Sequence, residues 1–206
     1  MAIRTAVNRA LTAITALPTA AALTDGNLTL LTTATASSSA TLSFTSSINS
    51  TYNSYLFKFI NIHPSEASRP QFNLSADGGS NYNVTKTTTF FASYHAESGG
   101  STGGLGYSTG GDLAQGTGVQ RLGGDTDADN DTAMSGTLTL FNPSSTTFVK
   151  HFIATTQQVS TAYSQELFLG GYANTTSAIN AIQFSQDTGT IQSGTIKMYG
   201  VGPKQS

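Results

Sequence analysis

The sequence contains no cysteine and no tryptophan, and only 10% of its 206 residues are charged. The absence of cysteine excludes a disulfide framework, a thiolate metal site and a cysteine nucleophile. The formal net charge is −2, and the nine lysine and arginine residues are scattered from Arg4 to Lys204. Because recognition of nucleic-acid phosphates requires clustered cationic side chains, we expect no nucleic-acid partner.

Long apolar runs are also absent. No stretch of 18 consecutive apolar residues occurs, so we expect no membrane-spanning helix and no membrane partner. The N-terminal stretch has Arg4 and Arg9 followed by an alanine- and leucine-rich run, which superficially resembles a signal peptide. Threonines interrupt that run at positions 12, 15 and 19, and this favours a different interpretation.

Apolar residues near the N-terminus follow the 4-3-4-3 spacing of a short amphipathic helix, and they are Ile3, Val7, Ala10, Ile14 and Leu17. Pro18 ends this pattern. We therefore predict an uncleaved helix over residues 1–18. Residues 19–39 read as an extended connector that contains a turn at Asp25-Gly26-Asn27 and a short strand at Leu28–Leu31.

From residue 40 onward the chain reads as strands. Tyr55, Phe57 and Phe59 alternate with Leu56 and Lys58, which is the two-residue period of a pleated strand. The 11 phenylalanines and 8 tyrosines argue against disorder, because disordered chains lack aromatic residues. Nine or ten such runs and no helical period predict that residues 40–206 form an antiparallel β-sandwich of jelly-roll type, preceded by an arm over residues 1–39.

One long loop interrupts the strands. It runs from Glu97 to Thr132 and holds 11 of the 21 glycines. Loops of this length are uncommon unless they are functional or disordered. Brief strands are expected inside it near Leu105–Tyr107 and Val119–Leu122. We expect the loop to form a variable tip of the sandwich.

Four aspartates alternate at the end of this loop, and they are Asp125, Asp127, Asp129 and Asp131. The first three match positions 1, 3 and 5 of an EF-hand calcium loop. The match then fails, because Asn130 replaces the required glycine and Gly136 replaces the bidentate glutamate. A calcium site of another kind stays open as a weak alternative. The preferred interpretation is a hydrated turn with no cofactor.

Catalytic motifs are absent from the sequence. The histidines His63, His95 and His151 lie in separate segments, and no G-x-S-x-G or H-E-x-x-H motif occurs. Nothing in the sequence brings two of Glu66, Glu97 and Glu166 together as a carboxylate pair for glycoside hydrolysis. We therefore expect no enzyme and name no catalytic residue.

The tyrosines offer another kind of site. Tyr94, Tyr107 and Tyr163 lie in or beside the long loop and the strands around it. Such rings can stack on sugars, and they can equally lie at the margin of a core with the hydroxyl in water.

Several stretches resemble small structural proteins of the virions of marine tailed bacteriophages, especially cyanophages. The similarity covers residues 36–202. It is carried by "SSSATLSFTSSINSTYNSYLFKFINIHP", "TFFASYHAE", "GTLTLFNPSSTTFVKHFIA" and "GGYANTTSAINAIQFSQDTGTIQSGTIKMYGVG". The resemblance implies a particle component rather than an enzyme, and it supplies no catalytic residues. The first 35 residues lie outside it.

These observations lead to one expectation and two alternatives. We expect a head decoration or cement protein on the virion exterior, with the major capsid protein as a partner. A two-heptad helix is too short to be stable alone, so we expect it to anchor a homotrimer. The predicted anchor contacts are Ile3, Val7, Leu11, Ile14 and Leu17. One alternative is a tail or vertex fibre module that binds a host surface glycan, and the more distant one is a calcium-dependent carbohydrate-binding module.

Overall fold

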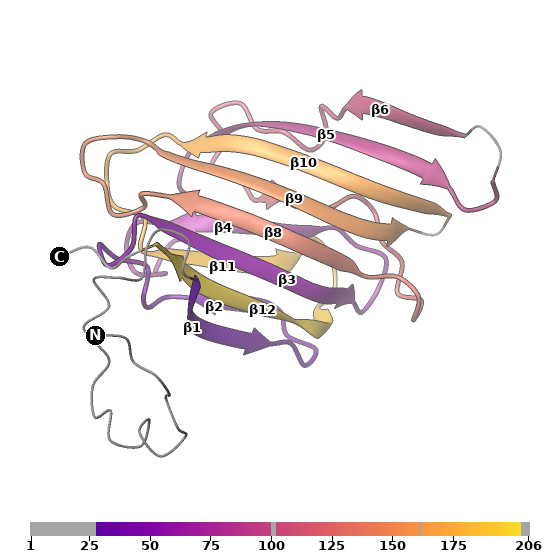
Figure 1. Ribbon diagram of the computed structural model, residues 1–206, viewed down its shortest axis with the longest axis horizontal. Coiled ribbons are helices and arrows are strands. Elements are labelled where there is room, and N and C mark those ends of the chain that lie inside the picture. Colours follow the sequence, from indigo (N-terminus) through magenta and orange to yellow (C-terminus); the bar gives the residue numbers. More distant parts are fainter. Residues whose placement is uncertain (1–27, 100–101, 161, 203–206) are drawn as a thin grey trace, which may run out of the picture.

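The computed structural model describes residues 28–99, 102–160 and 162–202, which form twelve β-strands and no helix. Every strand pair is antiparallel, and the strands make two sheets (Figure 1). The prediction of an all-β sandwich is thereby confirmed. The described residues contain no helix long and apolar enough to cross a membrane.

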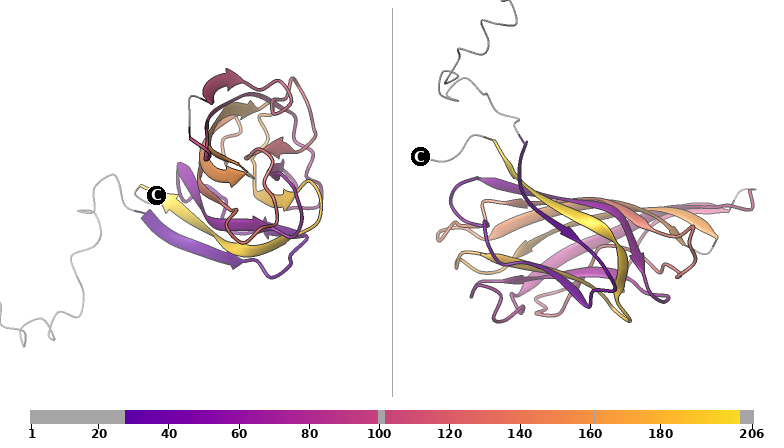
Figure 2. Two further views of the ribbon diagram at one scale, coloured as in Figure 1. Left: turned by 90° about the vertical axis from the view of Figure 1, so that its right-hand side faces the viewer. Right: turned by 90° about the horizontal axis from the view of Figure 1, so that it is seen from below.

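The larger sheet contains eight strands, in the spatial order β1 (Leu28–Thr35), β12 (Ile191–Val201), β3 (Ser54–Pro64), β8 (Met134–Phe141), β9 (Lys150–Ser160), β10 (Tyr163–Ala173), β5 (Lys86–Ala96) and β6 (Gly103–Tyr107). The smaller sheet contains β2 (Thr41–Phe44), β11 (Ala181–Gln186), β4 (Pro70–Ser75) and β7 (Gln120–Arg121) in that order. The larger sheet curves over the smaller one (Figure 2).

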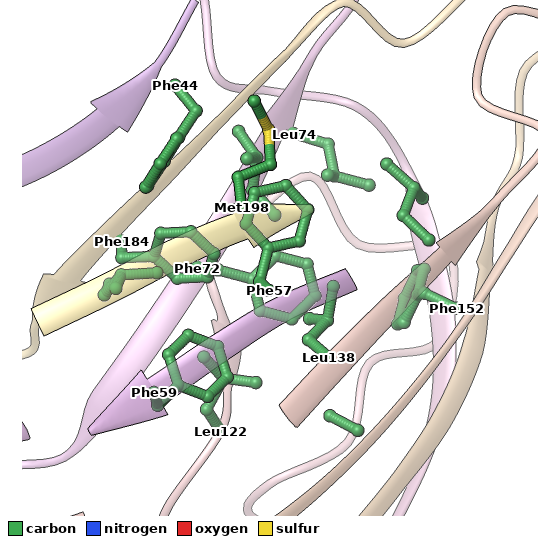
Figure 3. Packing of buried hydrophobic residues seen from close by; sticks show 14 of the residues in the cluster. Phe44, Phe57, Phe59, Phe72, Leu74, Leu122, Leu138, Phe152, Phe184 and Met198 are labelled. Atoms are coloured by element: carbon green, nitrogen blue, oxygen red, sulfur yellow. The ribbon is translucent and has the colours of Figure 1, made fainter. Parts of the chain in front are cut away.

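The core lies between the two sheets, and the alternation seen in the sequence builds it. On β3, Tyr55, Phe57 and Phe59 are buried, while Lys58 between them is exposed. Phe184 of β11 lies opposite and forms close ring contacts with Phe59 and three other phenylalanines (Figure 3). Its pairs with Phe44 and Phe59 are edge to face, and such pairs contribute about 0.5–1.5 kcal/mol each beyond the burial of their area.

The described part of the predicted connector belongs to the larger sheet. Strand β1 extends over eight residues, longer than the strand expected at Leu28–Leu31, and it pairs with β12 from Leu28↔Val201 to Thr35↔Thr195. The predicted helix over residues 1–18 and its anchor contacts Ile3, Val7, Leu11, Ile14 and Leu17 lie outside the described residues.

The long loop divides into two parts with different positions. The first part contains β6, which pairs with β5 as the outer edge of the larger sheet. The second part, residues 108–133, folds back and adds the two-residue β7 to the smaller sheet beside β4. Both brief strands expected inside the loop are therefore present. The first part extends the larger sheet outward, as expected of a tip. The second part packs against the sandwich and does not form a tip.

Candidate ligand-binding cavity

An open cavity of about 360 Å3 lies where residues 108–133 meet the larger sheet. One wall is the inner face of β5 and β10, with Phe90, Ala92 and Leu167. The opposite wall contains Arg121 and the residues that follow it. The larger sheet has four more strands than the smaller one, so the inner face of its last strands is covered by this loop rather than by a facing strand.

Inward-facing polar side chains on the larger sheet hold the loop in place. The Thr88 hydroxyl accepts the Leu113 N–H at 2.8 Å and donates to Gln120 Oε1 at 2.7 Å. The Thr156 hydroxyl donates to the Leu122 carbonyl at 2.5 Å. Gln158 Oε1 accepts the Gly124 N–H at 3.0 Å. Buried backbone groups need such partners, so these polar residues in a core position fix the loop against the sheet.

Two glycines allow the loop backbone to approach the sheet closely. A Cβ atom on Gly111 would lie 2.3–2.8 Å from the Phe90 ring, and one on Gly124 would lie 2.8 Å from Gln165 Oε1. A side chain on Gly111 would push the loop away from the Phe90 ring, and one on Gly124 would displace the Gln165 amide, so either would change the shape of the cavity. The glycine content of the loop thus has a packing reason at these positions.

Arg69 forms one rim of the cavity and is held by two carboxylates. Its Nε donates to Asp125 Oδ1 at 2.6 Å, and its Nη1 lies 3.2 Å from Asp187 Oδ2. Burial alone would raise the pKa of Asp187, but hydrogen bonds from the Arg69 backbone N–H and the Ser68 hydroxyl outweigh it, so the pKa of Asp187 is lowered. Asp187 therefore remains ionised at neutral pH, and it shares the Arg69 guanidinium with Asp125.

Arg121 is the second arginine of the cavity, and its guanidinium forms no ion pair with any residue of the described part of the chain. Gln165 lies on the opposite wall, where its Oε1 accepts a hydrogen bond from Gln158 Nε2 at 3.0 Å. That bond directs the Gln165 amide and leaves its Nε2 as a donor. The Tyr163 ring closes the wall beside it.

The structure does not bring the four aspartates to one point. Asp125 is 76% exposed and directed to Arg69, and Asp129 and Asp131 are exposed. The backbone carbonyls of Asp127 and Asp129 both accept the Thr132 hydroxyl, which forms the turn. Within the described ranges no three His, Cys, Asp or Glu side chains are grouped so as to hold a metal ion.

Two of the three candidate tyrosines meet. The rings of Tyr94 and Tyr163 contact edge to face with centroids 5.7 Å apart. Tyr107 lies on β6, where it is 55% exposed and donates to Asp112 Oδ2 at 2.5 Å. The hydrogen bond to this carboxylate raises the pKa of Tyr107. Only Tyr163 of the three lines the cavity.

The histidines and glutamates considered for catalysis lie on different elements. His63 lies near the end of β3, and its Nδ1–H donates to the Thr132 carbonyl at 2.6 Å. Together with Asp131 it lines a second open cavity of about 360 Å3. His151 is exposed on β9 and contacts Tyr172. No hydrogen bond or ion pair among the described residues links any two of these histidines and glutamates.

The sequence pattern did not identify Arg69, Arg121 or Gln165 as site residues. Arg69 and Arg121 are about 50 positions apart in the sequence, and Arg121 and Gln165 are 44 positions apart. Only the pairing of β4 with β7 and the fold of the loop place the three residues around one cavity. One signal in the sequence could have indicated Arg121: charged residues are rare in this chain, so an arginine inside the long loop is a candidate for binding.

The described residues thus define an all-β sandwich with an open cavity, lined by polar and apolar residues, between a glycine-rich loop and the inner face of its larger sheet. No protein-family model matches the chain, and no curated protein or solved structure is significantly similar to it.

Proposed function

We propose that this protein is a non-enzymatic structural protein of a bacteriophage particle, which decorates or cements the capsid surface and works by contact. The proposal is supported by the resemblance of residues 36–202 to small virion proteins of marine tailed phages. It is also supported by the position of β1 relative to the glycine-rich loop.

That position is the observation which carries the proposal. The described part of the chain begins with β1, which is one edge of the eight-stranded sheet, and β6 of the glycine-rich loop is the opposite edge (Figure 1). Leu28 pairs with Val201, so the chain enters and leaves the sandwich at the same end of this strand pair. A body with its attachment at one edge and its loop at the other suits a module that is anchored to a shell and faces outward.

We further propose that the sandwich is a jelly roll with two added hairpins. Its support is the nested pairing of β1 with β12, β2 with β11, β3 with β8, and β4 with β7. A jelly roll winds eight strands in this nested way over two four-stranded sheets. The hairpins β5–β6 and β9–β10 extend one of those sheets from four strands to eight.

We propose a homotrimer that is held by the arm, with Ile3, Val7, Leu11, Ile14 and Leu17 as contacts. Strand β1 supports association near the arm, because this edge strand has eight residues and none is charged or proline. Edge strands of monomeric proteins are commonly protected by such residues. Light scattering should give the mass of three chains for the full protein and one chain for a variant of residues 28–206. Equal masses would contradict a trimer held by the arm.

A second candidate function is favoured by the cavity. A fibre or vertex module that binds a host surface glycan needs an open polar site with a few directed donors, and the cavity beside Arg121 has these properties. The calcium-dependent carbohydrate-binding alternative has no such support, because the aspartates do not converge.

The exterior position is tested on gradient-purified particles of the phage that encodes the protein. The protein should sediment with the particles, and protease added to intact particles should cleave it while the genome stays protected. Protein that remains at the top of the gradient would contradict the proposal. Protein that is cleaved only after the particles are broken would contradict its exterior position.

A further inference from the structure

We propose that the cavity beside Arg121 binds a carboxylated sugar, such as a hexuronate unit of an acidic surface polysaccharide. The inference rests on the proposed exterior position, because only an exposed module reaches such a polymer. It goes further by assigning the site, the chemical class of the ligand and the residue that selects it.

The shape of the cavity is the first argument. Its volume of about 360 Å3 lies in the range of small-molecule sites, about 300–1,000 Å3. The loop that forms one wall is fixed by hydrogen bonds from Thr88, Thr156 and Gln158, so the cavity exists before a ligand arrives. A preformed site does not spend binding free energy on ordering its walls.

The charge of the cavity is the second argument. Arg69 is ion-paired with Asp125 and Asp187, whereas Arg121 forms no ion pair within the described part of the chain. The charged residues that line the cavity are Arg69, Arg121 and Asp125, so one positive charge is in excess there. A guanidinium presents parallel N–H groups that match the two oxygens of a carboxylate. Arg121 is therefore the group that would distinguish an acidic sugar from its neutral counterpart.

The remaining wall fits the other parts of a sugar. Gln165 Nε2 and the hydroxyls of Ser108 and Ser160 supply hydrogen-bonding groups for sugar hydroxyls. Tyr163 and Leu167 supply an apolar surface for the C–H face of a pyranose ring. A simple inorganic anion would use Arg121 alone and leave this mixed surface without a role.

The test measures binding by calorimetry at 0.15 M salt with the full chain. The probes are trigalacturonate and a mannuronate trimer, with galactotriose as the neutral counterpart and succinate as a carboxylate without a sugar ring. At least one uronate trimer should bind, and galactotriose and succinate should bind at least about tenfold more weakly. A hydrogen-bonded charge contributes at least this factor.

Two variants locate the site. R121Q should weaken binding of the uronate about tenfold or more, while K58Q should leave it within twofold. Lys58 is the matched control, because it is exposed on the other face of the same larger sheet and its substitution removes the same charge. Circular dichroism of both variants checks that the fold is retained.

Four results would overturn the inference. They are failure of both uronates to bind at millimolar concentration, equal binding of galactotriose, equal binding of succinate, or unchanged uronate binding by R121Q. These results are independent of the particle experiments. If the protein is on the virion exterior but does not bind uronates, only this inference is contradicted. If it binds uronates but is absent from particles, only the proposed function is contradicted.

Discussion

The ammonium group of Lys86 donates to Oδ1 of Asn73 across the interior, with the two atoms 2.5 Å apart. Lys86 is on β5 of the larger sheet and Asn73 is on β4 of the smaller one, and both residues are buried. Asn73 Nδ2 in turn donates to the carbonyls of Tyr82 and Thr117. This one amide therefore joins both sheets to the glycine-rich loop that forms the candidate site.

We predict that N73A destabilises the protein by about 2–3 kcal/mol, because it leaves the buried Lys86 ammonium with only the Val84 carbonyl as a partner. N83A is the matched control, since Asn83 is exposed, and it should change the free energy of unfolding by less than about 0.5 kcal/mol. Urea denaturation measures both. Equal stability of the two variants would contradict the bridging role of Asn73.

Stability should rise with pH above about 8. Burial lowers the pKa of Lys86 from 10.5 to about 8, so between these values the unfolded chain binds more protons than the folded protein. The free energy of unfolding therefore increases with pH across this window, and Lys150, whose pKa is also lowered by burial, acts in the same direction. In K86M this slope should be reduced. Denaturation curves at pH 7.5, 9 and 10 test it, and an unchanged slope in K86M would contradict the assignment.

The two carboxylates around Arg69 should differ in their contributions to stability. Asp125 is 76% exposed, so D125N should cost less than about 1 kcal/mol. Asp187 also accepts the Arg69 N–H at 2.7 Å and the Ser68 hydroxyl at 2.8 Å, so D187N should cost about 1–3 kcal/mol. Because the pKa of Asp187 is lowered, its contribution is present at neutral pH and is lost as the pH falls through that lowered pKa. A larger loss in D125N would reverse this ranking.

F184A should destabilise the sandwich by about 3–5 kcal/mol, because the Phe184 ring contacts Phe44, Phe57, Phe59 and Phe72 in the centre of the core. F148A is its control, since Phe148 is 68% exposed, and should have little effect. Thermal and urea denaturation measure the difference. Similar losses in both variants would contradict the packing described.

Chelation should leave the protein unchanged. The aspartates from Asp125 to Asp131 do not form a metal-binding group in the described residues, so the unfolding temperature should be the same in EDTA and in millimolar Ca²⁺. A ligand that binds only the folded state raises its stability. An upward shift of the unfolding temperature with Ca²⁺ would contradict the interpretation of this segment as a hydrated turn.

The strands were predictable because their burial follows a local rule. Tyr55, Phe57 and Phe59 alternate with the half-buried Leu56 and the exposed Lys58, and a two-residue period places the three aromatic residues on one face whatever the partner strand is. The position of the glycine-rich loop and the brief strands inside it were predictable for a related reason, since glycine clusters and short apolar runs are also local signals.

The candidate site was not predictable in this way. Thr88, Thr156 and Gln158 face the core as polar residues, and their role becomes clear only when the loop backbone that they bind is in place. Arg121 and Gln165 line one cavity through strand pairings between distant segments, which no local pattern encodes. The sequence therefore led to the exposed aspartates as candidates, whereas the cavity depends on residues that are inconspicuous along the chain.

The most direct test of the account is the number of copies of this protein per particle, measured by quantitative mass spectrometry of purified particles against the major capsid protein. A decoration or cement protein should be present at a ratio near parity. A few copies per particle would contradict capsid decoration and favour the fibre or vertex module. Absence from the particles would contradict the virion function altogether.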